Sequence, residues 1–400
     1  MNRIYLDNSA TTFLLPEVAL AMQECLGRRY ANPASMHTEG QRARRFLEET
    51  RGQIAAILGA DVQGRCADHL VFTSGGTEAN NLALRGLAGR GPAQVIVSPV
   101  EHPSIAGPAQ QLARQDISVR HLSVDALGLV NPDQLRTLAR GDVRLVSVML
   151  ANHETGVLQP VAGIAAVCAE SGVPVHTDAV QAVGKMTVNF RELGAAALSF
   201  SAHKFHGPVG IGGLLLRHDV LPDPLLFGGS QQRGIRPGTE SLALAVGMLR
   251  ALQLWQDESE KTQRHLEYLR NRFEELLRAE IPGLLVNGEG APRTPHTTNV
   301  SFPGVDRQVM LMALDAAGIA CSTGSACASG ASEPSAVLRA MGLAESRIGG
   351  ALRFAFSRLN TEEEVAASAA RISRAYKELH AAHGVRKQPA TSRLPGAKPL

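Results

Sequence analysis

The chain has 400 residues, of which 44% are hydrophobic and 19% charged, and this composition excludes collagen-like and wholly disordered proteins. Basic residues exceed acidic residues by 40 to 37 without forming long runs, so neither a nucleic acid nor a membrane surface is expected as a partner. The five scattered cysteines form no C-x-x-C pair, which argues against a disulfide framework and a zinc site. We expect a cytoplasmic, reduced protein, because the N-terminus shows no apolar leader and no apolar run approaches membrane-spanning length.

Short apolar runs alternate with helical patterns between about residue 70 and residue 216. The candidate strands are Leu70–Thr73, Gln94–Ser98, Arg144–Leu150, Val173–Thr177 and Ala197–Phe200. Their near-continuous apolar character is typical of strands buried in a parallel sheet. Apolar residues from Ala79 to Leu87 recur at helical spacing, and Asn131-Pro132 supplies the cap and first residue of another helix. This alternation predicts an α/β fold with a mostly parallel sheet between helices.

The pattern changes after Trp255. Residues 259–281 are highly charged but carry one apolar stripe, and Thr361 and Glu364 form a capping box before a second stripe. These features predict a large domain over residues 14–255 and a smaller α+β domain that combines residues 1–13 with 256–382. Residues 383–400 have no apolar stripe, so we expect a disordered tail.

Polar or glycine-rich segments follow each of the five predicted strands. Ligands of doubly wound sheets bind beyond the carboxyl ends of the strands, so these segments predict one shared site. In chain order they are Ser74–Glu78, Glu101-His102, Asn152–Glu154, Asp178 with Gln181, and Ser201–Lys204. The first is a glycine turn that opens into a helix, where free N–H groups and the Thr77 hydroxyl make a seat for an anion. The alternative is an ordinary turn with Thr77 near the helix cap.

Asp178 and Lys204 end neighbouring strands of this predicted sheet. Pyridoxal phosphate (PLP) needs a lysine for its Schiff base, a carboxylate for its ring nitrogen and a cup for its phosphate, and the sequence offers all three. An Asp–Lys ion pair without a cofactor is the alternative. His102 suits stacking on such a ring or relaying protons, although a lone histidine is more often an unremarkable residue.

Cys327 lies in a segment of small residues, Cys321–Gly330, which favours a mobile loop and a nucleophilic thiol over a buried hydrophobic residue. Cys321 is either structural or an accidental second thiol. Further along, Arg353 is the one cation in an alternating apolar strand, where a guanidinium can bind a carboxylate with two hydrogen bonds or form a structural ion pair.

Together these segments resemble the cysteine desulfurases of the NifS/IscS type, which are PLP enzymes of fold type I. The similarity runs in order from about residue 4 to residue 365 and leaves out the tail. It is carried by YLDNSATT, NPAS, FTSGGTEANN, VEHPSI, HTDAVQAVGK, SFSAHKFHGPVGIG, RGIRPGT, STGSACAS, EPSAVLRAMG and ALRFAFSR. The Gly-Ser-Ala-Cys segment is similar to the group that has a long mobile cysteine loop.

The resemblance implies a role for each site residue. Lys204 would bind the cofactor and act as the base at Cα, Asp178 would pair with the ring nitrogen, and Gln181 would bind the phenolic oxygen. His102 would stack on the ring and move protons. The phosphate would be held by Gly76, Thr77, Ser201 and His203, and by Thr239 from the other subunit of a homodimer. Arg353 and Asn152 would bind the substrate, with Arg353 at its carboxylate, and Cys327 would accept the sulfur.

Two positions depart from the family pattern. His153 stands where the family has the second asparagine of Asn-Asn-Glu, which contacts cofactor or substrate, so its role is open. Ala202 replaces the glycine of Ser-Gly-His-Lys and slightly reshapes the phosphate cup.

The resemblance implies conversion of L-cysteine to L-alanine, with the sulfur carried as a persulfide on Cys327. The sulfur would pass to an acceptor protein, either an iron–sulfur scaffold or a tRNA-thiolation enzyme, and a cluster could be shared with the scaffold through Cys327. Two alternatives stay open. One is a selenocysteine lyase or another class V PLP aminotransferase, and the other is a cofactor-free protein that docks sulfur acceptors.

Overall fold

A computed structural model describes residues 2–28, 30–324 and 333–386. Its larger sheet has seven strands, and the order across the sheet is β2-β8-β7-β6-β5-β3-β4. In chain order these strands are β2 (His69–Thr73), β3 (Ala93–Val97), β4 (Ile117–His121), β5 (Val143–Ser147), β6 (Val175–Asp178), β7 (Ala197–Ser201) and β8 (Gly212–Leu216). Strand β8 runs antiparallel to both neighbours and every other pairing is parallel, which confirms the predicted α/β sheet.

All five predicted strands are present, to within a few residues at their ends. Strands β4 and β8 were not predicted, and each has a sequence reason. Strand β4 lies at the edge of the sheet and alternates buried with exposed residues, whereas β8 begins with two glycines.

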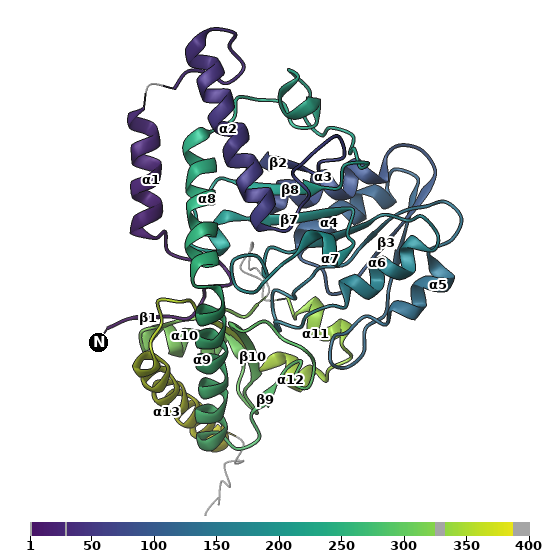
Figure 1. Cartoon of the computed structure of the whole chain (residues 1–400). Helices are drawn as coiled ribbons and strands as arrows, with labels where there is room; N and C mark the ends of the chain where they lie inside the picture. Colours follow the sequence, from purple (N-terminus) through teal and green to yellow (C-terminus); the bar gives the residue numbers. More distant parts are fainter. Residues whose placement is uncertain (1, 29, 325–332, 387–400) are drawn as a thin grey trace, which may run out of the picture.

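Helices cover both faces of this sheet (Figure 1). One face carries α1 (Pro16–Gly27), α2 (Thr38–Ile57), α6 (Val161–Ala169) and α8 (Leu242–Asp257), together with the short helices α5 (Leu135–Leu138) and α7 (Phe190–Leu193). The other face carries α3 (Gly76–Ala88) and α4 (Pro103–Ala113). The segment that Asn131 caps is shorter than expected, a 3-10 turn over Pro132–Gln134 followed by the single turn of α5.

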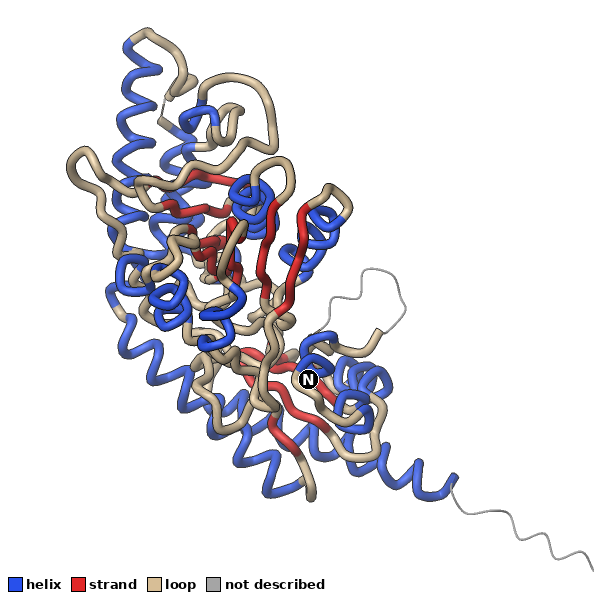
Figure 2. Tube along the Cα trace, turned by 90° about the vertical axis from the view of Figure 1, so that its right-hand side faces the viewer, coloured by secondary structure: helices blue, strands red, loops and turns tan. Residues whose placement is uncertain are grey.

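A second sheet lies below the first and is separate from it (Figures 1 and 2). Its three antiparallel strands are β9 (Leu285–Val286), β10 (Thr297–Ser301) and β12 (Ala351–Ala355), in the order β12-β10-β9. Around it pack α9 (Ser259–Glu280), α10 (Arg307–Ala316) and α13 (Glu362–Arg386), with the short helices α11 (Ala336–Ala340) and α12 (Glu345–Gly349) nearby. The predicted capping box is confirmed, because Thr361 and Glu364 exchange side-chain-to-backbone hydrogen bonds of 3.3 Å.

The N-terminal segment joins this second core. Strand β1 (Ile4–Tyr5) pairs in parallel with β11 (Ile319–Ala320), and both Ile4 and Leu6 are buried among the apolar residues of the second sheet. Helix α13 continues to Arg386, past the predicted end of the small domain at 382, and the rest of the predicted tail lies outside the described residues. The domain boundaries themselves stay a prediction. No helix in the described ranges is both long and apolar enough to cross a membrane.

Candidate active site

The carboxyl ends of the central strands meet around a cavity of about 210 Å³. This is the edge that the sequence predicted, because β2, β5, β6 and β7 all deliver their following residues there. Nine predicted site residues line the cavity: Gly76, Thr77, His102, His153, Asp178, Gln181, Ser201, His203 and Lys204. The structure therefore brings together residues that are up to 128 positions apart in the sequence, since they run from 76 to 204.

Lys204 enters the cavity from the 3-10 turn Ala202–Lys204 that directly follows β7. Its Nζ donates hydrogen bonds to the backbone oxygens of Ser9 and Ala10, at 2.6 and 2.7 Å. Burial and the positive charge of Arg353 lower the pKa of this amine to about 8. A substantial fraction of Lys204 is therefore neutral near pH 7 to 8, which is the form that can act as a nucleophile or a base.

Asp178 is the last residue of β6 and is only 4% exposed. Its Oδ2 accepts a 2.6 Å hydrogen bond from Asn80 Nδ2, and its Oδ1 accepts one of 2.9 Å from the Val180 amide. No ion pair joins Asp178 to Lys204 among the residues that the structure describes. The two opposite charges line one cavity without contact, so the alternative of a direct Asp–Lys pair is not what the structure shows.

His102 caps the N-terminus of α4, and this cap fixes the orientation of its ring. Its Nδ1 accepts the backbone N–H of Ser104 at 3.1 Å and lies 2.7 Å from the Ser104 hydroxyl. The ring of His153 meets the His102 ring edge-on, with centroids 5.0 Å apart and an interplanar angle of 81°. Burial lowers the pKa of both imidazoles, well below the usual value for His153, so both rings are neutral at pH 7.

Gln181 is held by two groups that sequence reasoning did not identify. Its Nε2 donates to the Ser9 oxygen at 2.9 Å, and its Oε1 accepts a 2.9 Å hydrogen bond from the buried amine of Lys185. Because the Ser9 carbonyl oxygen can only accept, the NH₂ group of Gln181 must face Ser9 and the amide oxygen must face Lys185. The NH₂ group has a second N–H, and Gln181 lines the cavity, so this N–H can donate to a ligand.

The part of the cavity at the start of α3 suits a phosphate. Helix α3 starts at Gly76, so its first N–H groups have no acceptor within the helix. A Cβ at Gly76 would lie 2.8 Å from Val180 Cγ2, so a larger residue would displace this turn. The Ser201 hydroxyl is buried here without a hydrogen-bond partner, and an unpaired buried hydroxyl is costly unless a ligand completes it.

These observations fit PLP. The amine of Lys204 and the carboxylate of Asp178 are unpaired with each other, the Gln181 amide is turned to donate, and Ser201 lacks a partner at the helix N-terminus. Each group corresponds to one requirement of the cofactor: Schiff base, ring nitrogen, phenolic oxygen and phosphate.

Arg353 and Asn152 do not line this cavity. The guanidinium of Arg353 is 5% exposed and donates to the His153 backbone oxygen at 2.8 Å and to the Asp7 carboxylate at 2.9 Å. The amide of Asn152 is used within the protein, because its oxygen accepts the backbone N–H groups of Glu154 and Thr155 and its NH₂ group donates to the Val100 oxygen at 2.9 Å. Their predicted roles in binding substrate stay predictions, and Arg353 forms the structural ion pair that was the alternative.

The remaining predicted residues lie elsewhere. Thr239 is exposed and lines a separate cavity beside Thr73 and Ser74, so its contact with a second subunit stays a prediction. Cys327 lies outside the described residues. Burial raises the pKa of the Cys321 thiol, which favours the structural role for that residue.

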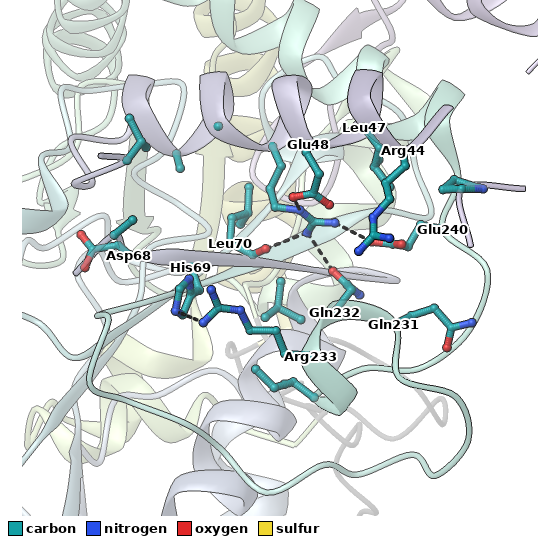
Figure 3. Close-up of a pocket in the computed structure, with 18 of the residues that line it drawn as sticks. Arg44, Leu47, Glu48, Asp68, His69, Leu70, Gln231, Gln232, Arg233 and Glu240 are labelled. Carbon is teal, nitrogen blue, oxygen red and sulfur yellow. Dashed lines mark hydrogen bonds and ion pairs between the residues drawn. The ribbon is translucent and has the colours of Figure 1, made fainter. Parts of the chain in front are cut away.

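A larger cavity lies beside β2, between α2 and the segment Ser230–Glu240 (Figure 3). It has a volume of about 690 Å³, yet it contains none of the predicted site residues. Arg51 lines this cavity and is bonded to Glu240, Gln232 and the Leu70 backbone oxygen. Arg51 forms ion pairs with both Glu48 and Glu240 here, so we place the reactive site in the smaller cavity.

Five contributing residues were not named as site residues from the sequence: Ser9, Ala10, Asn80, Ser104 and Lys185. Asn80, Ser104 and Lys185 follow predicted residues within the motifs FTSGGTEANN, VEHPSI and HTDAVQAVGK, so their position next to predicted site residues was an available signal. Ser9 and Ala10 act through backbone oxygens, which no side-chain pattern can indicate.

Comparison with known proteins agrees with this geometry. The sequence profile of the Aminotransferase class-V family matches residues 4–367. A cysteine desulfurase of Trichormus azollae is 42% identical over 367 residues, which cover 91% of this chain and 90% of that protein. The solved NifS-like protein of Rickettsia africae is 29% identical and superposes with a TM-score of 0.85, over 94% of this chain and 100% of that chain.

A third similar protein is SspA, solved in complex with cysteine, which is 28% identical with a TM-score of 0.76 over 89% of this chain and 99% of that chain. The family match spans nearly the whole chain, and the relatives at about 40% identity cover nine-tenths of it. The chain therefore belongs to the class V aminotransferase family of PLP-dependent enzymes, and within that family to the cysteine desulfurases.

Proposed function

We propose that this protein converts L-cysteine to L-alanine and receives the sulfur on Cys327 as a persulfide. The observation that carries the proposal is the cavity itself, where the amine of Lys204 and the carboxylate of Asp178 face one space without pairing. The similarity to named cysteine desulfurases and to a protein solved with bound cysteine supports L-cysteine as the substrate.

Bound PLP would supply a protonated ring that withdraws electrons from the substrate carbon. The residues of the chain do the rest. Lys204, with its pKa lowered to about 8, takes the Cα proton as a neutral amine and returns a proton later. Asp178, held by Asn80 and the Val180 amide, would pair with the ring nitrogen, and the Gln181 amide would donate to the phenolic oxygen.

The sulfur transfer needs no outside oxidant. The Cys327 thiolate attacks the sulfur of L-cysteine, a new S–S bond forms, and the electron pair of the broken C–S bond stays with the carbon that becomes the alanine methyl group. The enzyme thiol and L-cysteine therefore yield an enzyme persulfide and L-alanine, with atoms and electrons in balance.

Residues that flank the Cys327 segment support its delivery to this site. The Ser335 hydroxyl donates a 2.6 Å hydrogen bond to Glu154, and a Cβ built at Gly324 would lie 3.0 Å from the same carboxylate. Glu154 directly follows His153, which lines the cavity. Gly324 and Ser335, which flank the cysteine segment on its two sides, therefore both lie next to Glu154, the residue that follows the cavity-lining His153.

The persulfide sulfur is proposed to pass to an acceptor protein, either an iron–sulfur scaffold or a tRNA-thiolation enzyme. A homodimer is part of the same proposal. Large apolar side chains are exposed on the outer surface, with Phe227 at 79%, Val209 at 75% and Met36 at 84%, and a second copy would cover such residues. A cytoplasmic location is also proposed, because a persulfide-forming thiol must stay reduced before each turnover.

Mass spectrometry after L-cysteine treatment tests the proposal. We expect a mass gain of one sulfur that maps to Cys327, together with release of alanine. In Cys327→Ser the sulfur gain and the sulfide release should disappear while the absorption band of the bound cofactor remains. Cys321→Ser is the matched control and should keep both. Full desulfurase activity in Cys327→Ser, or no cofactor band in the unaltered protein, would contradict the proposal.

A further inference from the structure

A chain of buried hydrogen bonds runs along the wall of the cavity from Asp178 to His102. Asn80 and Ser104, which link the two, are only 1% and 7% exposed. Asn80 Nδ2 donates to Asp178 Oδ2 at 2.6 Å and to Ser104 Oγ at 2.8 Å. Ser104 Oγ in turn lies 2.7 Å from His102 Nδ1. The network therefore joins Asp178 to His102 through two buried residues of the cavity wall, and the proposed mechanism gives Ser104 no role.

The direction of each hydrogen bond follows from the chemistry of the groups. An amide nitrogen only donates, so both Asn80 bonds run outward, to the carboxylate and to the serine oxygen. The serine hydroxyl accepts from Asn80 and has one proton left, which it can give to His102. The backbone N–H of Ser104 also donates to His102 Nδ1, at 3.1 Å. His102 Nδ1 is thus an acceptor on two counts and cannot carry a proton.

The ring proton must therefore lie on Nε2. A neutral imidazole has one N–H, and burial keeps this ring neutral by lowering its pKa. His102 Nε2 has no hydrogen-bond partner in the part of the chain that the structure describes, and His102 lines the cavity. The N–H of this ring is consequently left for a ligand.

A second buried histidine, His176, also contacts serine hydroxyls, but its hydrogen bonds do not fix one tautomer. His176 lies 2.9 Å from the Ser147 hydroxyl on one ring nitrogen and 2.9 Å from the Ser199 hydroxyl on the other. Both partners can donate or accept, so neither ring nitrogen of His176 is fixed as an acceptor. His102 differs because a backbone N–H, which can only donate, meets its Nδ1.

We propose that Asn80 and Ser104 are positioning residues that hold His102 as the Nε2–H tautomer and present that N–H to the cofactor cavity. The role toward the cofactor rests on the proposed function, but the tautomer is a property of this chain and can be measured by itself. In this arrangement His102 is a hydrogen-bond and proton donor in its resting state. Of Lys204 and His102, Lys204 is then the residue that accepts a proton first.

Nitrogen NMR of the cofactor-loaded protein, labelled with ¹⁵N in histidine, tests the proposal. His102→Gln assigns the two ring signals. We expect Nδ1 of His102 in the range of an unprotonated nitrogen and Nε2 in the range of an N–H nitrogen. Ser104→Ala should shift the His102 Nδ1 signal and leave His176 unmoved, and Ser104→Thr, which keeps the hydroxyl, should restore it. Ser147→Ala is the matched control and should move only His176.

A kinetic measurement separates positioning from structural damage. Ser104→Ala should lower kcat roughly two- to tenfold, the range for loss of one neutral hydrogen bond, and Ser104→Thr should recover it. A protonated Nδ1 or a charged ring in the unaltered protein would overturn the proposal, as would an unmoved His102 signal in Ser104→Ala. Absence of a cofactor band would instead count against the proposed function, while the NMR result would still decide the tautomer.

Discussion

The larger and the smaller cavity differ in how their polar groups are satisfied. In the larger one, Arg51 is bonded to Glu240, Gln232 and a backbone oxygen, so its charge is already neutralised within the protein. In the smaller one, Lys204 and Asp178 are not paired with each other, and the Ser201 hydroxyl has no partner. Unsatisfied groups that converge on one space, rather than volume, therefore mark the site where a ligand belongs.

The largest expected effect comes from removing the amine. Lys204→Ala should lower the rate of alanine formation from L-cysteine by about 10⁴-fold, because it removes both the cofactor attachment and the base. The absorption band of the lysine-bound cofactor should vanish in the same variant. An alanine assay together with an absorption scan measures both effects. Retention of more than about a tenth of the activity would show that the smaller cavity does not hold the reacting amine.

A substitution in the larger cavity should lower the stability of the protein and leave catalysis nearly unchanged. Arg51→Ala leaves the Glu240 carboxylate, whose side chain is 12% exposed, without its partner, and such a change costs about 3–5 kcal/mol. We expect a lower denaturant midpoint in a urea titration, with kcat per folded molecule within about twofold of the unaltered protein. A large fall in kcat without a change in stability would show that this cavity serves the reaction directly.

A smaller, graded effect is expected from pH. In protein stripped of its cofactor, only neutral Lys204 can attack an aldehyde, so capture of added PLP should speed up about tenfold per pH unit and level off near pH 8. An ordinary lysine would keep gaining up to about pH 10.4. Stopped-flow absorbance at a series of pH values gives the break point. A rate still rising beyond pH 9 would mean that the site does not lower the pKa of this amine.

Much of the fold and of the cavity could be predicted because both follow from repeated local patterns. Apolar runs marked the buried parallel strands, and the residues placed just after them, such as Asp178 and Lys204, meet in space because parallel strands end at one edge. Strand β8 was not predicted because Gly212 and Gly213 shorten its apolar run. Strand β4 was not predicted because much of it is exposed to solvent.

The rest depended on contacts between distant segments. The pairing of Arg353 with Asp7 joins positions 346 residues apart, and no local pattern shows that a carboxylate of the N-terminal segment meets that guanidinium. Likewise, Asn80 and Ser104 look like ordinary polar residues near helix starts until the fold places them between Asp178 and His102. Side-chain partners across the fold are set by tertiary packing, which single-sequence patterns do not encode.

The backbone oxygen of Ser9 accepts from both Lys204 and Gln181, yet the strand just before it, β1, pairs with β11 in the second core. The reacting amine is thus steadied by a segment anchored in the second core. A fragment limited to the seven-stranded sheet would contain Lys204 but lack the two carbonyls that restrain it. Catalytic competence should accordingly appear late in folding, after the first few residues have docked against β11.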